Sequence, residues 1–124
     1  MQLLELQATL SSPSVCFDPE QGLLHMKGES YPENTFEFFS PLIAWIDSYI
    51  QSSSAPVRLE LELAYLNTGS VKCLMDIFDM FEDAHVDGRD VGVVWRYNQK
   101  NTRALETAEE FSEDLSFPFM IEAI

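Results

Sequence analysis

The stretch VRLELELAYL (57–66) alternates between apolar and charged side chains over most of its length. Successive side chains of a β-strand point to opposite faces of the sheet. One face of this predicted strand is apolar: Val57, Leu59, Leu61, Leu63 and Tyr65. The other face carries the charged side chains: Arg58, Glu60 and Glu62. Strands covered by helices on both faces are apolar throughout, so the pattern predicts a sheet with helices on one face only.

The rest of the chain supplies the other elements of such a sheet. Residues 91–98 and the C-terminal FPFMIEAI alternate in the same way, and residues 1–10 form a weaker strand. Residues 14–18 and 23–28 flank DPEQG, which predicts a hairpin whose turn holds Asp18, Pro19 and Gly22. Helical spacing of apolar residues predicts helices within 31–50, from 71 to 81 and near 101–115. The predicted fold class is α/β: a single two-layer domain over residues 1–124, with a mixed β-sheet and helices on one face.

The first predicted helix has an unusually broad apolar surface. Ser30 and Glu33 have capping-box spacing with Pro32 in the first turn, and Pro41 predicts a kink or a restart capped by Ser40. One ridge is expected to face the core: Phe36, Phe39, Ile43, Ile46 and Ile50. A second ridge lies beside it: Phe38, Leu42, Trp45 and Tyr49. Either the sheet covers both ridges, or Phe38, Trp45 or Tyr49 stays partly exposed as a docking surface.

The charge of the chain limits its partners. The net charge is -14, from 21 acidic and 7 basic residues. Such a surface repels nucleic-acid phosphates and anionic membranes, so neither nucleic-acid binding nor membrane insertion is expected. A protein partner with basic patches fits better, although ordinary solubility also explains the acidity. The N-terminal MQLLELQATL lacks the basic start of a signal peptide, and Cys16 and Cys73 have no metal-binding spacing. We therefore expect a cytoplasmic protein with two buried thiols.

Signatures of catalysis are absent from the sequence. No phosphate-binding glycine loop, HExxH or GxSxG motif occurs, and neither His25 nor His85 is paired with a nucleophile in the sequence. One helix carries four carboxylates that suggest either a metal site or a solvated helix face: Asp76, Asp79, Glu82 and Asp83. The solvated face is the more economical interpretation in so acidic a chain. We predict no enzyme activity, no cofactor and no metal site.

The remaining candidate is the junction Asn67-Thr68-Gly69-Ser70, where the clearest strand passes into a helix. Asn67, Thr68 and Ser70 are all residue types that accept hydrogen bonds from the free N–H groups of a helix N-terminus, so an ordinary N-cap explains the composition. The same N–H groups and the positive end of the helix dipole also favour a phosphate on a hydroxyl there. Gly69 permits close approach of another segment, and Lys72 is the only cation nearby in the sequence. Both interpretations of the junction stay open at this point.

Five motifs resemble one family of bacterial regulators along nearly the whole chain: GESYPEN (28–34), WIDSYI (45–50), YLNTGSVKCLMDIFDMFEDAH (65–85), VVWRYN (93–98) and EEFSEDLSFPF (109–119). The chain resembles the SiaC-type regulatory phosphoproteins. The resemblance implies a fold similar to STAS-domain anti-sigma-factor antagonists and a role in partner switching. It implies a Ser/Thr kinase (SiaB-like), a PP2C-type phosphatase (SiaA-like) and a GGDEF diguanylate cyclase (SiaD-like). The unphosphorylated form would activate the cyclase, raise cyclic di-GMP and promote biofilm formation.

The resemblance also singles out residues. It implies that Thr68 is the phosphorylated residue, with Ser70 as a secondary candidate. The phosphosite loop would comprise Asn67, Gly69, Ser70 and Lys72. Many relatives have a hydroxyl residue where this chain has Gly69, which leaves the local preference of the kinase open. Six residues are candidates for partner binding: Tyr31, Pro32, Glu33, Asn34, Phe38 and Trp45.

Two other functions fit the sequence less closely. One is a phosphorylation-independent adaptor that docks a partner through the apolar helix face. The other is a small acidic metal-binding enzyme that uses the helix carboxylates and a histidine.

Overall fold

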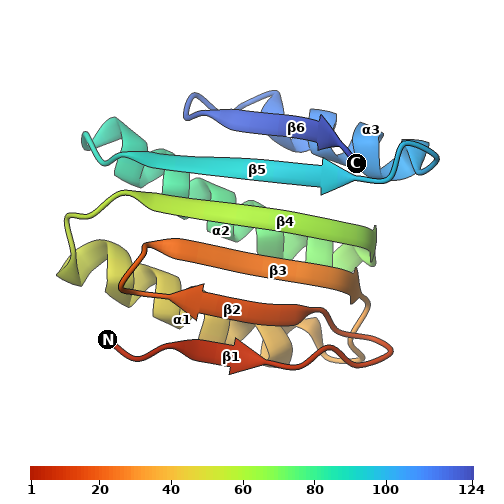
Figure 1. The fold of residues 1–124 in the computed structure, drawn as a ribbon, viewed down its shortest axis with the longest axis horizontal. Coiled ribbons are helices and arrows are strands. Elements are labelled where there is room, and N and C mark those ends of the chain that lie inside the picture. Colours follow the sequence, from red (N-terminus) through yellow and green to blue (C-terminus); the bar gives the residue numbers. More distant parts are fainter.

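Six strands form one mixed sheet in the computed structural model, which describes residues 1–124, and three helices pack against it (Figure 1). The elements follow one another along the chain as β1 (Leu4–Leu6), β2 (Ser14–Asp18), β3 (Leu23–Ser30), α1 (Thr35–Ser52), β4 (Val57–Leu66), α2 (Thr68–Val86), β5 (Val91–Tyr97), α3 (Thr102–Ser112) and β6 (Phe119–Ala123). The strands lie side by side in sequence order. β1, β2 and β3 pair antiparallel, whereas β3 to β6 pair parallel.

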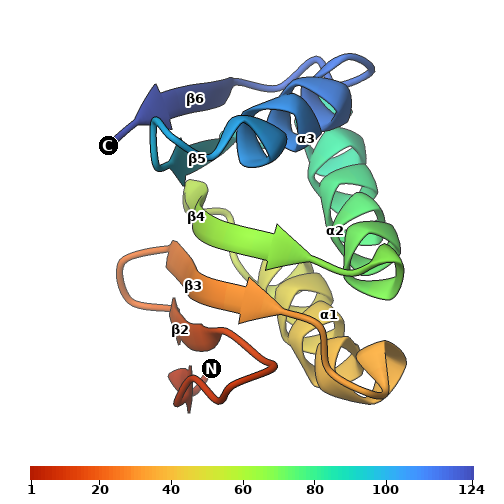
Figure 2. The same cartoon turned by 90° about the vertical axis from the view of Figure 1, so that its right-hand side faces the viewer.

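All three helices lie on the same face of the sheet (Figure 2). Each helix connects two neighbouring parallel strands, and each connection moves across the sheet in the same direction. Because such crossovers are right-handed, successive steps in one direction place every helix on one face. The predicted two-layer α/β fold is therefore confirmed.

The buried layer lies between the sheet and the helices. Four of the five apolar side chains of β4 that were expected to face inward are buried: Val57, Leu59, Leu61 and Leu63. They pack with large side chains of other elements, among them Trp95, Phe78 and Phe81. Tyr65 departs from the expected pattern, because its side chain is 46% exposed near the end of the strand.

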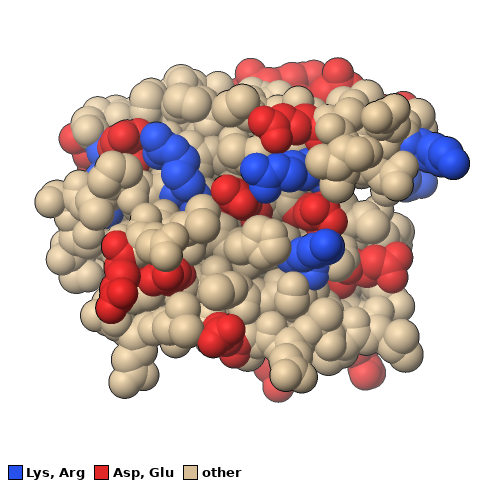
Figure 3. All heavy atoms as spheres, viewed as in Figure 1, with Lys and Arg blue, Asp and Glu red and all other residues tan.

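The opposite face of the sheet is open and carries charged side chains (Figure 3). Arg96 pairs with Glu60 at 3.0 Å and with Glu122 at 3.3 Å, and Lys27 pairs with Glu62 at 3.4 Å. These pairs are partly exposed, so each contributes little to stability. They do explain why the polar side of β4 needs no covering layer.

The first helix begins later than predicted. Asn34 is the N-cap of α1, and its Oδ1 accepts a hydrogen bond from the Glu37 N–H at 3.0 Å. The predicted capping box of Ser30 and Glu33 is wrong, because Ser30 is the last residue of β3 and pairs with Leu66 of β4. The predicted restart at Pro41 is also wrong. α1 runs through Pro41. Pro41 has no N–H for the Glu37 carbonyl, and both residues are exposed, so that carbonyl is not left in the apolar core.

The buried stripe of α1 also differs from the predicted ridge. The buried residues are Phe39, Leu42, Ile46 and Tyr49. Phe36, which was expected in the core, is 74% exposed in the first turn of the helix. Phe38 and Trp45 are half-buried, whereas Tyr49 is buried and donates its hydroxyl to the Pro19 carbonyl at 2.9 Å. The apolar surface of α1 is thus covered in part, and its most exposed aromatic side chain is Phe36.

The first strand, the last helix and the hairpin can each be compared with their predicted bounds. The strand expected over residues 1–10 is confined to Leu4–Leu6. The last helix spans Thr102–Ser112 and is capped by Asn101, whose Oδ1 accepts from the Ala104 N–H at 3.1 Å. The predicted hairpin is confirmed, with Gly22 of its turn at a positive φ of 64°.

Candidate functional site

The junction between β4 and α2 uses one of its three candidate caps. Asn67 is the N-cap, and its Oδ1 accepts from the Ser70 N–H at 2.9 Å. The Asn67 N–H donates to the Ser30 carbonyl at 2.9 Å, which joins the junction to the end of β3. Thr68 is the first residue of α2, and its side chain is exposed and makes no hydrogen bond within the chain. The hydroxyl of Thr68 is therefore free for another molecule.

Ser70, the secondary candidate for phosphorylation, is fully buried. Its Oγ lies 2.7 Å from the Oγ of Ser30, and it also donates to the Ser30 carbonyl at 3.0 Å. These bonds fasten the start of α2 to the end of β3. Transfer of a phosphoryl group to Ser70 would require this pair to open, so the geometry favours Thr68 over Ser70.

The pair predicts a measurable coupling between Ser30 and Ser70. Replacing Ser70 by alanine leaves the buried hydroxyl of Ser30 without its partner, and we expect a loss of about 1 kcal/mol in the free energy of unfolding. Removing both hydroxyls with Ser30→Ala and Ser70→Ala should cost less than the two single changes together, because no unpaired group remains. Urea denaturation followed by tryptophan fluorescence measures both. Strictly additive losses would contradict the pairing.

Gly69 marks a close approach between two helices. A Cβ atom built on Gly69 would lie only 2.4 Å from Oγ1 and 2.8 Å from Cγ2 of Thr35, the first residue of α1. No side chain fits at position 69 while Thr35 keeps its place. The first turns of α1 and α2 are thus in contact, and the positive ends of both helix dipoles lie next to Thr68.

All three helices begin with the same pair of residues. Asn34-Thr35, Asn67-Thr68 and Asn101-Thr102 each place asparagine at the N-cap and threonine as the first helical residue. Thr35 is half-buried against Gly69, whereas Thr68 and Thr102 are exposed. Thr102 therefore shares with Thr68 the asparagine cap, the first position of a helix and an exposed side chain, although ψ of the cap is 78° at Asn101 and 171° at Asn67. It provides an internal control for any claim about Thr68.

Exposed aromatic side chains are present on the segments that meet at this end of the molecule. Tyr31 and Tyr65 are 40% and 46% exposed, and their rings touch edge to face at a centroid distance of 5.8 Å. Phe36 follows Thr35 directly and is the most exposed aromatic residue of the chain. We call Tyr31, Phe36, Tyr65 and Thr68 the Thr68 face. Apolar rings exposed together at one end of a small protein are typical of a protein-binding surface.

The other predicted site residues divide into two groups. Pro32, Glu33 and Asn34 lie in the turn next to the junction, and the Pro32 carbonyl accepts from the Asn67 side chain at 3.5 Å. Lys72 is exposed and forms no ion pair. Trp45, in contrast, donates its indole N–H to the Gln2 carbonyl at 2.9 Å, so it belongs to the packing of the N-terminal segment. Phe38 packs edge to face on Phe39 and is half-buried.

No assembled site for metal or thiol chemistry is present. No group of three or more His, Cys, Asp or Glu side chains is placed to hold a metal ion. Glu82 instead accepts from the Ser116 N–H at 2.8 Å, and hydrogen bonding by the Ser116 hydroxyl and amide lowers the pKa of Glu82. Burial, together with the charge of Asp76, raises the pKa of Cys73, so this thiol stays protonated. Cys16 is only half-buried, contrary to expectation. None of the three helices is both long and apolar enough to cross a membrane.

The fold and the junction together define a class of protein. A one-sided α/β sheet that presents a free hydroxyl at the start of a helix is compatible with a small regulatory domain, although the fold alone does not assign that function. The comparison with protein families agrees, because residues 6–124 match the SiaC family of regulatory phosphoproteins. The chain belongs to this family. The resemblance inferred from the five sequence motifs is confirmed.

Several similar proteins are from Pseudomonas aeruginosa. An uncharacterized protein of strain UCBPP-PA14 is 46% identical over 123 residues, which cover 99% of this chain and 98% of the relative. The solved structure of apo-SiaC has a TM-score of 0.96 at 45% identity, covering 99% of this chain and 100% of that one. SiaC in complex with the diguanylate cyclase SiaD, which it activates, gives a TM-score of 0.95 at 45% identity, covering 98% and 99%. The chain was predicted not to be an enzyme, and its membership of a family of regulatory phosphoproteins supports this prediction.

Sequence reasoning missed three features of the site. The Ser30–Ser70 pair and the contact of Thr35 with Gly69 join segments that lie far apart in the sequence. The exposure of Phe36 was missed because its helical spacing to Phe39 and Ile46 placed it on the expected core ridge. One signal was available for the helix contact: a glycine in the first turn of a helix costs stability unless a neighbour needs the space.

Proposed function

We propose that this protein is a phosphorylation-controlled activator of a GGDEF diguanylate cyclase, and that residues 1–124 act as one regulatory domain. In its unphosphorylated form it binds the cyclase, raises cyclic di-GMP and promotes biofilm formation and aggregation. A SiaB-like Ser/Thr kinase phosphorylates Thr68 and ends this interaction, and a SiaA-like PP2C-type phosphatase restores it. The kinase uses ATP, which places the cycle in the cytoplasm. The observation that carries the proposal is the exposed, unbonded hydroxyl of Thr68 within the Thr68 face.

The surroundings of Thr68 support both states of this switch. A phosphate there would carry about −1.5 to −2 charges, and the adjoining first turns of α1 and α2 favour negative charge. Phosphorylation is therefore compatible with the folded chain. The same charge would stand at the end of the molecule where the aromatic side chains Tyr31, Phe36 and Tyr65 are exposed. Burying it against a partner without a matching cation is costly, so the phosphate would block docking and leave the fold intact.

Phosphorylation of the purified protein tests the proposed acceptor. We expect the SiaB-like kinase with ATP to add one phosphoryl group, and peptide mapping by mass spectrometry to place it on Thr68. A Thr68→Val variant should show no mass change, and a Thr68→Ser variant should still be modified, because the hydroxyl stays at the start of α2.

Thr102 is the matched control in this experiment. It occupies the same position after an asparagine cap and is also exposed, yet we expect no phosphate on it. An unchanged mass after incubation with the kinase would contradict the proposal. So would a phosphate that maps to Ser70 or Thr102.

A further inference from the structure

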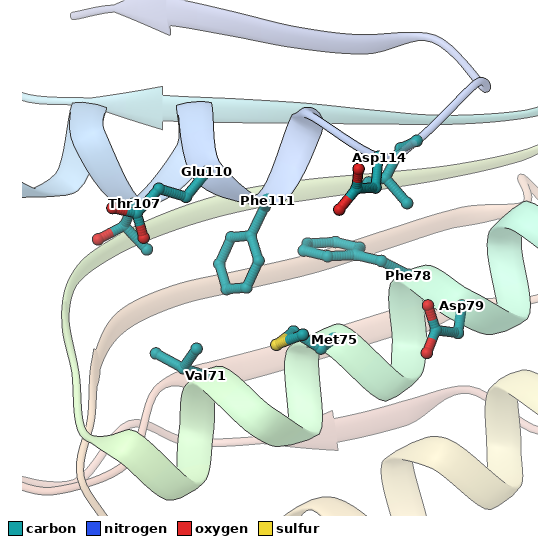
Figure 4. A pocket seen from close by; sticks show the side chains of 9 residues that line it. Val71, Met75, Phe78, Asp79, Thr107, Glu110, Phe111 and Asp114 are labelled. Carbon is teal, nitrogen blue, oxygen red and sulfur yellow. The ribbon is translucent and has the colours of Figure 1, made fainter.

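An apolar groove of about 320 Å³ runs between α2 and α3, beginning one turn after Thr68 (Figure 4). Its floor consists of apolar side chains from both helices and the segment after α3: Val71, Met75, Phe78, Phe111 and Leu115. Figure 4 shows Phe111 reaching down from α3 towards Met75 and Phe78 of α2. The groove is a different surface from the Thr68 face: it lies further along α2, and the two share no residue.

The aromatic side chains of the floor pack against each other and against the buried core. Phe78 and Phe111 meet edge to face at a centroid distance of 5.0 Å, and Phe111 also contacts the buried Trp95 at 5.8 Å. Met75 is 52% exposed above this pair. A flexible, polarizable methionine over a rigid aromatic floor is suited to contact apolar side chains of varied shape.

The rim of the groove is acidic. Asp79, Glu110 and Asp114 line it, no basic residue does, and none of the three forms an ion pair. No metal cluster accounts for these carboxylates. An occupant that places Lys or Arg side chains along the rim would gain charge complementarity at both walls. A second copy of this chain fits poorly, because each copy carries a net charge of -14.

We propose that the groove binds an amphipathic helix of a partner protein, whose apolar face is bordered by Lys or Arg. Two helices with a groove between them accept the side-chain ridge of a third helix, with apolar residues about three or four positions apart. Apolar side chains of the partner cover Met75 and reach Phe111, while its cations lie against Asp79, Glu110 and Asp114. The inference concerns a surface beyond the Thr68 face and does not depend on phosphorylation.

A synthetic peptide provides the probe. It is a blocked, fluorescein-labelled helix of about five turns, with leucines on one face and lysines beside them. A second peptide has the same composition in scrambled order, and a third has glutamates in place of the lysines. We expect the first peptide to bind, measured by fluorescence anisotropy, and the other two to bind at least about tenfold more weakly. Amide shifts in NMR spectra should map its site to Val71, Met75 and Phe111.

Two methionines make a matched pair of variants. Met75 in the groove and Met120 on the open face of the sheet are 52% and 54% exposed. Met75→Lys and Met120→Lys change the net charge equally, so general charge attraction falls by the same amount in both. We expect Met75→Lys to weaken binding about tenfold or more and Met120→Lys to change it less than about twofold. Equal losses, equal binding of the scrambled peptide, or shifts mapped to another surface would overturn the proposal. Dimers that Met75→Lys dissociates in sedimentation would also overturn it, in favour of self-association.

Discussion

Thr68→Asp is expected to weaken binding to the GGDEF cyclase by about 10- to 100-fold, because it places a carboxylate on the Thr68 face, where aromatic side chains are exposed for docking. Thr68 is exposed at the first position of α2, where a negative charge favours the helix dipole, so the substitution should leave the fold intact. The loss would therefore appear in association and not in stability. Titration of the cyclase with each variant, followed by its rate of cyclic di-GMP synthesis, measures the effect.

Two controls separate the effect of the negative charge from the shape of the new side chain and from its position in the chain. Thr68→Asn has nearly the shape of aspartate without its charge, and we expect it to bind within a few-fold of the unmodified chain. Ser48→Asp adds the same charge at an exposed position of α1 and should leave binding unchanged. Thr68→Ala should keep binding even in the presence of kinase and ATP. A cyclase that responds equally to all four variants would identify a phosphorylation-independent adaptor and would refute the switch.

The fold was predictable because the strands carry a strong local signal. Apolar residues occupy every second position of β4 from Val57 to Leu63, with charged residues between them, so the sequence predicts that one face of the sheet is open to solvent. The start of α1 was not predictable in this way. Ser30 and Asn34 are both good N-caps, and the choice depends on Ser30 pairing with Leu66 in the neighbouring strand. The exposure of Phe36 was not predictable either, because its helical spacing to Phe39 and Ile46 is that of a core ridge, whereas it lies in the first turn and is 74% exposed.

The candidate site shows the same limit. Asn67, Thr68 and Ser70 all have side chains that accept from a helix N-terminus, and local sequence does not decide among them. The contact with Ser30 distinguishes them. Ser70 is buried in a hydrogen bond with Ser30, which lies 40 positions earlier in the sequence, whereas Thr68 stays exposed. The motif itself is not distinctive, since Asn-Thr begins all three helices. Only the family resemblance singled out Thr68 from the sequence, and the environment of each threonine then gives a physical reason for the choice.

Gly69 provides the sharpest test of how the site is built. In the first turn of a helix, alanine is normally more stable than glycine, by up to about 1 kcal/mol. At position 69 the added methyl would lie 2.4 Å from Oγ1 of Thr35, and its contact with Cβ of Thr35, at 3.0 Å, would persist in every rotamer of that residue. Overpacking of this kind costs about 1–3 kcal/mol, so we expect Gly69→Ala to lower the free energy of unfolding by about 2 kcal/mol, against the helix propensity. Urea denaturation measures the change.

Shortening Thr35 should recover much of that loss. Thr35→Ala removes Oγ1 and Cγ2, the two atoms nearest to the added methyl, and leaves only the contact at 3.0 Å. The double variant Thr35→Ala, Gly69→Ala should therefore be more stable than the sum of the single effects predicts, by about 1 kcal/mol or more. Lys72→Ala, at an exposed position on the same helix, should change stability by less than about 0.5 kcal/mol. A stabilising Gly69→Ala, or additive effects in the double variant, would mean that α1 and α2 do not meet at this glycine. A hydroxyl residue at position 69 is then expected to require a smaller residue at position 35, since the two compete for one space.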